Sequence, residues 1–303
     1  MAITLFKNPA LNDPVLIASW PGIGSIGTVA VDALRRSLEA EEFGGIEPWE
    51  FFYPKKVLIR SGVLEDIEFP SSRFYYKKMA KRDLMLFLGE EQPSDGGRAY
   101  AAGEKAYRMA NLVLDVAQQF GCRRVYTSGA AVAAVHHTAR PRVWAVPNSE
   151  HLIDEISDYD NTILMSDIEG RGGQGSITGL NGLLLGVAKM RSLEAICLMG
   201  EIPIYLQGLP FPYPKASKSV AEVLAKTLGL DIDWEAISAI VEASEKEIEK
   251  LYAVFPAEIK EQLDKLREAS RPQSADPGPI TEEDKRRILE DIDKLFGRES
   301  KED

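Results

Sequence analysis

The sequence predicts an α/β protein: a three-layer α/β/α domain around a mixed sheet, followed by a helical extension. Continuous apolar runs such as residues 83–88 and 195–199 alternate with amphipathic segments, which is typical of strands buried between two layers of helices. Residues 49–60 and 62–77 resemble strands joined by short turns, so we expect a mixed sheet and not a purely parallel one. The last third of the chain has only helical periodicity, which predicts the extension.

The first predicted strand, residues 15–20, leads into a glycine loop that contains Gly22, Gly24 and Gly27 and then into a helix at residues 28–38. This strand, GxGxxG loop and helix have the order of a dinucleotide-binding fingerprint. Such a fingerprint continues into a second parallel strand that ends in an acid about 20 residues on. Glu47 has that spacing, but the segments around it suggest a meander. Close packing of the helix on its strand is therefore the preferred interpretation of the glycines, and an anion or dinucleotide site stays open.

The middle of the chain alternates between the two kinds of element. Residues 102–120 form an amphipathic pattern with apolar side chains at spacings of three and four, which predicts a long helix. Cys122 and Cys197 lie beside or within apolar runs and are expected to be small core residues and not a disulfide. The remaining elements predicted in this region are strands at 83–88, 125–128, 142–146 and 195–199 and a helix at 177–190.

Composition excludes several function classes. The chain has 303 residues, a net charge of −11, 45% hydrophobic and 27% charged residues. The acidic charge argues against nucleic acid or an anionic membrane as partner. The sequence contains no apolar run of 18 residues and does not begin like a signal peptide, so we expect a cytoplasmic protein. His136 and His137 lack metal-ligand spacing and, as neighbours, are expected to point apart; no metal is predicted.

The last third divides into three parts after a core domain at residues 1–230. Residues 231–270 are predicted to be a helical subdomain that packs on the core or on a neighbouring subunit, with a coiled-coil-like seam that includes Trp234, Ile248 and Leu251. Residues 271–279 are a Pro-rich linker. Residues 280–303 hold a tethered amphipathic helix and a charged tail, and the helix either folds back or docks on a partner. Its predicted contact residues are Ile288, Ile292 and Phe296.

Polar and glycine-rich loops follow several of the predicted strands, and ligands of open α/β sheets bind where such loops meet. The loop at residues 170–175 adds free N–H groups and Arg171, although it is not a Walker motif. Paired carboxylates would allow acid–base chemistry, but the nearby serine lacks a nucleophile elbow, so no catalytic residue and no cofactor is assigned. The candidate crevice residues are Gly22, Gly24, Gly27, Glu90, Glu91, Ser128, Arg171, Gly173 and Glu201.

Several motifs occur together in a recognisable order. They are residues 20–27 (WPGIGSIG), the Gly-Glu pairs at 89–90 and 200–201, residues 179–184 (GLNGLL), residues 213–217 (YPKAS) and residues 228–233 (LGLDID). In this order, from about residue 10 to 255, the chain resembles the proteasome assembly chaperone family, the archaeal and bacterial homologues of the second eukaryotic assembly chaperone. The resemblance implies a phosphorylase-like α/β/α domain that assembles into rings or smaller oligomers. It also implies that some members bind proteasome subunits, and it carries over no catalytic residue.

One departure from that resemblance concerns the tail. Chaperones that dock into proteasome pockets end in a hydrophobic residue, a tyrosine and any residue, whereas this sequence ends in Ser-Lys-Glu-Asp. Docking through the tail is therefore expected to be weak.

Three hypotheses about function follow. The first is a non-enzymatic, oligomeric protein-binding or assembly factor, with itself as one partner and proteasome subunits or another protein as client. The alternative is an enzyme or sensor that binds a nucleotide, nucleoside or other anion in the glycine-loop crevice. The third is a purely structural role.

Overall fold

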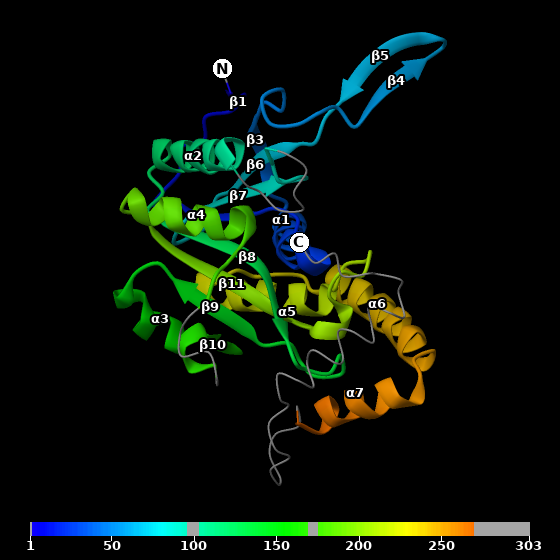
Figure 1. Cartoon of the computed structure of the whole chain (residues 1–303). Coiled ribbons are helices and arrows are strands. Elements are labelled where there is room, and N and C mark those ends of the chain that lie inside the picture. The colour runs from blue at the N-terminus through cyan, green and yellow to red at the C-terminus, as the bar shows by residue number, and fades with distance from the viewer. Residues whose placement is uncertain (1, 96–102, 169–174, 270–303) are drawn as a thin grey trace.

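The computed structural model describes residues 2–95, 103–168 and 175–269, and a nine-stranded sheet runs through it (Figure 1). The strand order is β1-β3-β6-β7-β2-β8-β11-β9-β10. The four central strands β7, β2, β8 and β11 are parallel, while β1, β3 and β6 pair antiparallel on one side and β9 pairs antiparallel with β11 on the other. The predicted mixed sheet is thus confirmed. The strands are β1 (Ile3–Leu5), β2 (Val15–Ser19), β3 (Glu41–Ile46), β4 (Lys56–Arg60), β5 (Val63–Glu68), β6 (Ser72–Lys77), β7 (Leu84–Gly89), β8 (Arg124–Ala133), β9 (Val143–Pro147), β10 (Thr162–Leu164) and β11 (Glu194–Pro203).

Helices cover both faces of the sheet, which confirms the three-layer architecture. Helices α1 and α5 pack on one face, and α2 and α4 pack on the other (Figure 1). The helices are α1 (Ile26–Ser37), α2 (Gly103–Gln119), α3 (Ile153–Ser157), α4 (Gly179–Met190), α5 (Pro214–Leu228), α6 (Glu235–Ala253) and α7 (Ala257–Ala269).

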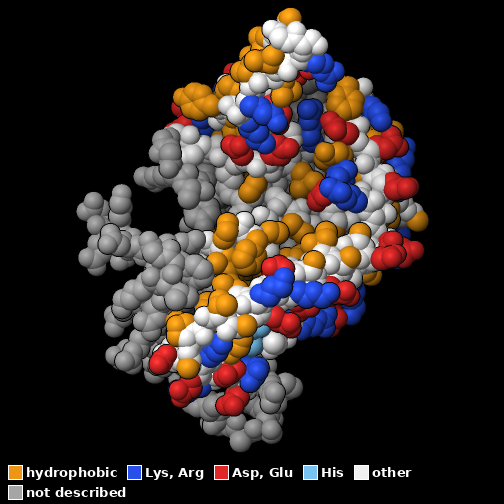
Figure 2. All heavy atoms as spheres, turned by 90° about the vertical axis from the view of Figure 1, so that its right-hand side faces the viewer, with side chains coloured by type: hydrophobic (Ala, Val, Ile, Leu, Met, Phe, Trp, Pro, Cys, Tyr) orange, Lys and Arg blue, Asp and Glu red, His pale blue; other side chains and the backbone are white. Residues whose placement is uncertain are grey.

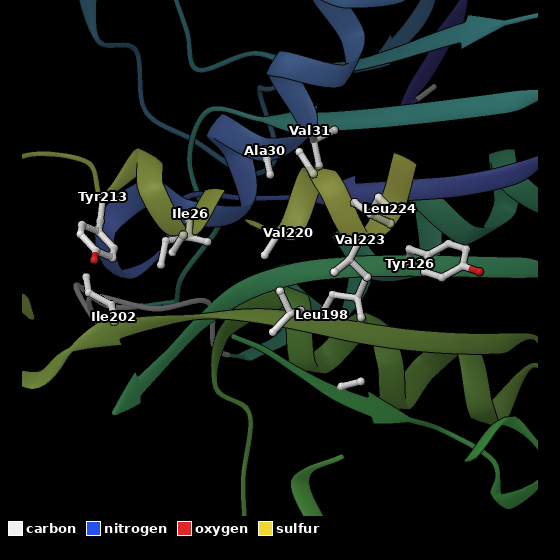
Figure 3. Packing of buried hydrophobic residues seen from close by; sticks show 14 of the residues in the cluster. Ile26, Ala30, Val31, Tyr126, Leu198, Ile202, Tyr213, Val220, Val223 and Leu224 are labelled. Atoms are coloured by element: carbon white, nitrogen blue, oxygen red, sulfur yellow. The ribbon is translucent and has the colours of Figure 1, made fainter. Parts of the chain in front are cut away.

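The central strands supply both hydrophobic cores by alternation. On β2, Val15 and Ile17 belong to the core under α1 and α5, whereas Leu16 and Ala18 belong to the core under α2 and α4. Successive side chains of a strand point to opposite faces, so a continuous apolar run is required where both faces are covered. Figure 3 shows the first core from close by, with side chains of α5 directed toward those of β8 and β11.

The segment between β3 and β6 differs from the prediction. Two strands were expected at residues 49–60 and 62–77, but the structure divides this region into β4, β5 and β6. Only β6 joins the main sheet, and β4 and β5 form a separate two-stranded hairpin that projects from the body (Figure 1). Pro70 lies between β5 and β6, and because proline has no N–H to donate to a ladder, it favours ending one strand before the next begins.

The seam of α6 faces the inside of the chain. Ile237 and Ile248 are buried, and Ile248 lies in the same core as α1 and α5. Trp234 and Leu251 are partly buried against that core. Helix α7 adds its own apolar stripe to it through Ile259, Leu263 and Leu266. Helices α6 and α7 therefore pack on the core of their own chain, while the predicted linker and tethered helix at residues 271–303 lie outside the described residues.

Truncation of Ile248 should destabilise the protein. Ile248→Ala removes a side chain that is only 2% exposed, so we expect the free energy of unfolding to fall by about 2–5 kcal/mol. Ile240→Ala on the outer face of α6, where the side chain is 51% exposed, is the matched control and should change it by less than about 0.5 kcal/mol. Urea denaturation measures both, and equal losses would contradict the inward orientation of the seam.

Candidate functional site

The glycine loop lies at the carboxyl end of β2, where the sequence places it. Residues Ile23–Ser25 form a short 3-10 turn between β2 and α1. Gly24 has a φ of +61°, a conformation that glycine adopts without steric cost. The carbonyl oxygen of Gly24 accepts a hydrogen bond of 2.8 Å from the N–H of Tyr213, the residue that precedes α5. The loop thus connects the start of α1 to the start of α5.

Gly27 is the position at which α1 approaches the sheet most tightly. A Cβ atom there would overlap the carbonyl oxygen of Ser128 on β8 and the hydroxyl of Ser19 on β2. Gly22, in contrast, has an extended backbone, and a Cβ atom there would meet nothing within 4 Å. This difference favours the packing interpretation of the glycines, because the helix needs Gly27 for close contact.

Side chains of the protein itself occupy the hydrogen-bonding groups of this edge. Gln92 donates from Nε2 to the carbonyl oxygen of Pro21, and its Oε1 accepts from the N–H of Leu180 in the first turn of α4 at 2.8 Å. Asn181 Oδ1 accepts from the N–H of Trp20 at 3.3 Å. The N-terminus of α4 and the end of β2 are therefore already engaged by side chains of the protein.

The three candidate carboxylates do not form a pair. Glu201 on β11 is buried and accepts hydrogen bonds from Arg142 (2.9 Å from Nη2) and from Trp144 Nε1 (2.8 Å), which joins β11 to β9. Glu90 follows β7, and β2 and β8 lie between β7 and β11, so the two strands that lead to these carboxylates lie about 14 Å apart at the usual strand spacing. Glu91 is exposed. Glu90 and Glu201 each accept hydrogen bonds from partners of their own, and no contact joins them in the described residues.

Glu90 has a structural partner of its own. Its carboxylate accepts from Lys55 Nζ at 2.7 Å and from the N–H of Ser71 at 3.0 Å. Burial alone would raise the pKa of Glu90, but these hydrogen bonds outweigh it and hold the pKa below its usual range. Glu90 is thus a stable anion that ties the base of the β4–β5 hairpin to the end of β7.

The remaining crevice candidates are placed as follows. Ser128 is fully buried within β8, and its Oγ has no hydrogen-bond partner among the described residues. Arg171 and Gly173 lie outside the described residues. The described part of the chain contains no group of three or more His, Cys, Asp or Glu residues that could hold a metal ion. It also contains no helix that is long and apolar enough to cross a membrane.

Of the predicted contact residues, Trp234 lines a surface hollow of about 350 Å³ beside the end of α5. The charged side chains that line this hollow are paired, Arg140 with Glu222 at 3.2 Å and Lys226 with Asp160 at 3.6 Å. The hollow therefore presents both signs of charge. Ile248 and Leu251 belong to the intramolecular core, and Ile288, Ile292 and Phe296 lie outside the described residues.

Two adjacent histidines form a buried stack beneath α6, and the expectation that they point apart is wrong. The rings of His136 and His137 lie 4.1 Å apart between centroids, and Tyr252 of α6 packs against both. His137 Nδ1 lies 2.7 Å from the hydroxyl of Tyr205, and His136 Nδ1 lies 2.8 Å from that of Thr138. The two residues do not continue a regular strand, because β8 ends at Ala133, so alternation does not apply to them.

Both histidines are held neutral by their surroundings. Burial lowers the pKa of His136 to about 4, assisted by the charge of Arg267. Burial also lowers the pKa of His137 to about 4, assisted by His136 and Lys215. The charge of Asp264 raises the pKa of His136, but it does not offset the lowering caused by burial. Burial likewise raises the pKa of the two free thiols, Cys122 and Cys197, to about 11, so both are unreactive core residues.

Among the described residues, the largest group of exposed apolar side chains lies on the β4–β5 hairpin, which the sequence pattern did not indicate. Val57 pairs across the ladder with Ile67, and Ile59 pairs with Leu64. Directly opposed residues share a face, and Val57 and Ile59 share a face because they are two apart. These four side chains, which we call the hairpin apolar face, are 44–71% exposed. Figure 2 shows hydrophobic side chains gathered on the hairpin and across the middle of the same side of the molecule.

A β-bulge creates this face. The register shifts between Leu58 and Ile59, so that Glu65 is the extra residue on β5. Without the bulge, Leu64 and Ile67 would point to opposite faces, because they are three residues apart. The other face is mixed: it carries ion pairs between Lys56 and Glu68 and between Arg60 and Glu65, together with Leu58 and the exposed Val63.

Comparison with known proteins identifies relatives of the whole body. The PAC2 family model matches residues 16–252. The chain is similar to the crystal structure of Pyrococcus furiosus PbaB, an archaeal proteasome activator, at 31% identity and a TM-score of 0.68, covering 82% of this chain and 97% of that one. It is also similar to a Mycobacterium tuberculosis proteasome-assembly chaperone homologue, at 19% identity and a TM-score of 0.62 over 80% and 97% of the two chains, a likeness of fold. An uncharacterized Methanocaldococcus jannaschii protein is 26% identical over 266 residues, covering 88% of this chain and 92% of that protein.

Substitutions at two of the glycines test whether Gly27 is required for close packing of α1. Gly27→Ala is expected to lower the free energy of unfolding by about 1–3 kcal/mol, because the new methyl group overlaps Ser128 and Ser19. Gly22→Ala should change it by less than about 0.5 kcal/mol. Chemical denaturation tests both variants. A Gly22→Ala variant as unstable as Gly27→Ala would contradict the packing interpretation.

The histidine stack predicts a pH dependence of stability. A folded pKa of about 4, below the ordinary value near 6.5, means that the unfolded chain binds protons first as the pH falls. The stabilisation is complete above pH 6.5 and is lost progressively toward pH 4. Between pH 7 and 5, a range above the ordinary carboxylate pKa values, we expect a loss of about 2 kcal/mol for each histidine and of about 4 kcal/mol for the pair.

Urea melts at several pH values measure this loss. A double variant, His136→Gln with His137→Gln, should reduce the slope of stability against pH. His151→Gln, at an exposed position, is the control and should retain the slope. An unchanged slope in the double variant would show that the stack does not cause it.

Proposed function

The chain belongs to the PAC2 family, and we propose that it is a non-catalytic, self-associating protein-binding factor that acts on proteasome subunits. The hairpin apolar face carries the protein-binding part of this proposal. Monomeric proteins seldom expose contiguous apolar surface without a use for it, and such surface is typical of contacts with other proteins. The client is inferred from the likeness to PbaB, described as a proteasome activator, over most of both chains.

The side chains that could take part in catalysis are already bonded or buried, which supports a role without catalysis. The carboxylate of Glu201 already accepts hydrogen bonds from Arg142 and Trp144. The carboxylate of Glu90 already accepts them from Lys55 and Ser71. Ser128 is enclosed within the sheet. The alternative, an enzyme or sensor for an anion, has less support because Gln92 and Asn181 already engage the N–H groups beside the glycine loop.

A reconstitution with proteasome subunits from the same organism tests the proposal. Purified α and β subunits are mixed with and without the full-length protein, and assembly is followed on native gels together with peptide hydrolysis. We expect binding with a dissociation constant in the micromolar range and a change in assembly rate or hydrolysis. An acidic protein of similar size and another fold is the control for non-specific effects. If sedimentation detects no complex when the protein is in roughly 50-fold molar excess over the proteasome subunits, the proposal is contradicted.

A further inference from the structure

We propose that the hairpin apolar face binds the same face of a second copy of this chain. The inference rests on the proposed function, since it names the surface through which the protein associates with itself. It starts from an imbalance in the hairpin: Val57, Ile59, Leu64 and Ile67 occupy one face and remain exposed. The other face has only two apolar side chains, Leu58 and Val63, beside the ion pairs Lys56–Glu68 and Arg60–Glu65.

The hairpin alone has little to stabilise it. An isolated two-stranded hairpin is marginally stable in water, and independent stability usually requires three or more strands with a covered apolar face. The exposed ion pairs Lys56–Glu68 and Arg60–Glu65 each contribute at most about 1 kcal/mol. A partner that covers the apolar face would therefore order the hairpin as well as bind it.

The charges favour a second copy as that partner. The whole chain has a net charge of −11, so most of its surface repels another copy. Residues 55–68 are an exception, with three basic residues (Lys55, Lys56 and Arg60) and three acidic residues (Glu65, Asp66 and Glu68), and their net charge is zero. Because the hairpin projects from the body (Figure 1), two copies can bring neutral segments together while their acidic bodies stay apart.

The geometry of the two faces is also compatible. Two sheets pack face to face about 10 Å apart, and two hairpins stacked in this way form a small two-layer core from eight apolar side chains. The contact is small compared with the roughly 1,200 Å² of a stable interface, so the hairpins by themselves should give association in the micromolar range. The charged faces then point outward to solvent.

Sedimentation of the full chain between 1 and 100 µM, about the range where such contacts dissociate, tests the apolar contact. The double variant Ile59→Ser with Leu64→Ser should weaken self-association at least about tenfold. The control, Met190→Ser with Val254→Ser, changes two apolar side chains of similar or greater exposure far from the hairpin and should leave self-association unchanged. Circular dichroism confirms that the body of each variant is folded.

Charge reversal tests whether two hairpins approach each other. Lys56→Glu with Arg60→Glu makes the hairpin acidic, and Glu65→Lys with Glu68→Lys makes it basic. At low ionic strength each variant alone should associate about tenfold more weakly than the parent, and an equimolar mixture of the two should regain association. Recovery in the mixture cannot come from a merely unstable hairpin, because each chain keeps its own substitutions.

The outcomes separate this inference from the proposed function. If the parent self-associates and the Ile59/Leu64 variant does so equally, the hairpin contact is overturned and the proposed function stands. If that variant loses proteasome binding but not self-association, the client and not a second copy covers the face, and the inference is overturned. A mixture of the charge variants that stays dissociated also overturns it.

Discussion

The approach of α1 to the sheet at Gly27 is the constraint on which the rest of this edge depends. No side-chain atom fits between the helix and Ser128, so the start of α1 has one position relative to β2 and β8. That position fixes the glycine loop, whose Gly24 carbonyl receives the N–H of Tyr213 and so places the start of α5. Helix α6 packs in turn on α5. A single close contact at the sheet thus influences the positions of α1, α5 and α6.

The carboxyl edge of the sheet is largely occupied by side chains of the protein. In open α/β sheets this edge commonly holds a ligand. Here Gln92 and Asn181 take hydrogen bonds that a bound anion would otherwise satisfy, and Glu201 joins two strands. In the described part of this edge, these hydrogen bonds connect neighbouring strands and helices to one another. The surface that we propose for recognition, the hairpin apolar face, lies instead on the projecting hairpin.

The elements with simple periodicity could be predicted from the sequence. The runs that became β2, β7 and β11 are apolar without interruption because both faces are covered, and the inward stripe of α6 follows helical spacing. The hairpin apolar face could not be predicted, because the bulge at Glu65 breaks the period of two on which such predictions rest. Nor could the partners of Glu90 or Gln92, since these bonds join residues 35 and 88 positions apart in the sequence.

The order of strands in the sheet has a consequence for synthesis on the ribosome. The first 89 residues supply β1, β3, β6, β7 and β2 as one contiguous half of the sheet, and the later residues supply β8, β11, β9 and β10 as the other. The nascent chain therefore completes half of the sheet with β2 as an open edge, and it must wait for β8 to emerge before that edge is paired. Open apolar edges are sites at which growing chains aggregate, so this protein is most exposed to misassembly between the synthesis of β7 and that of β8.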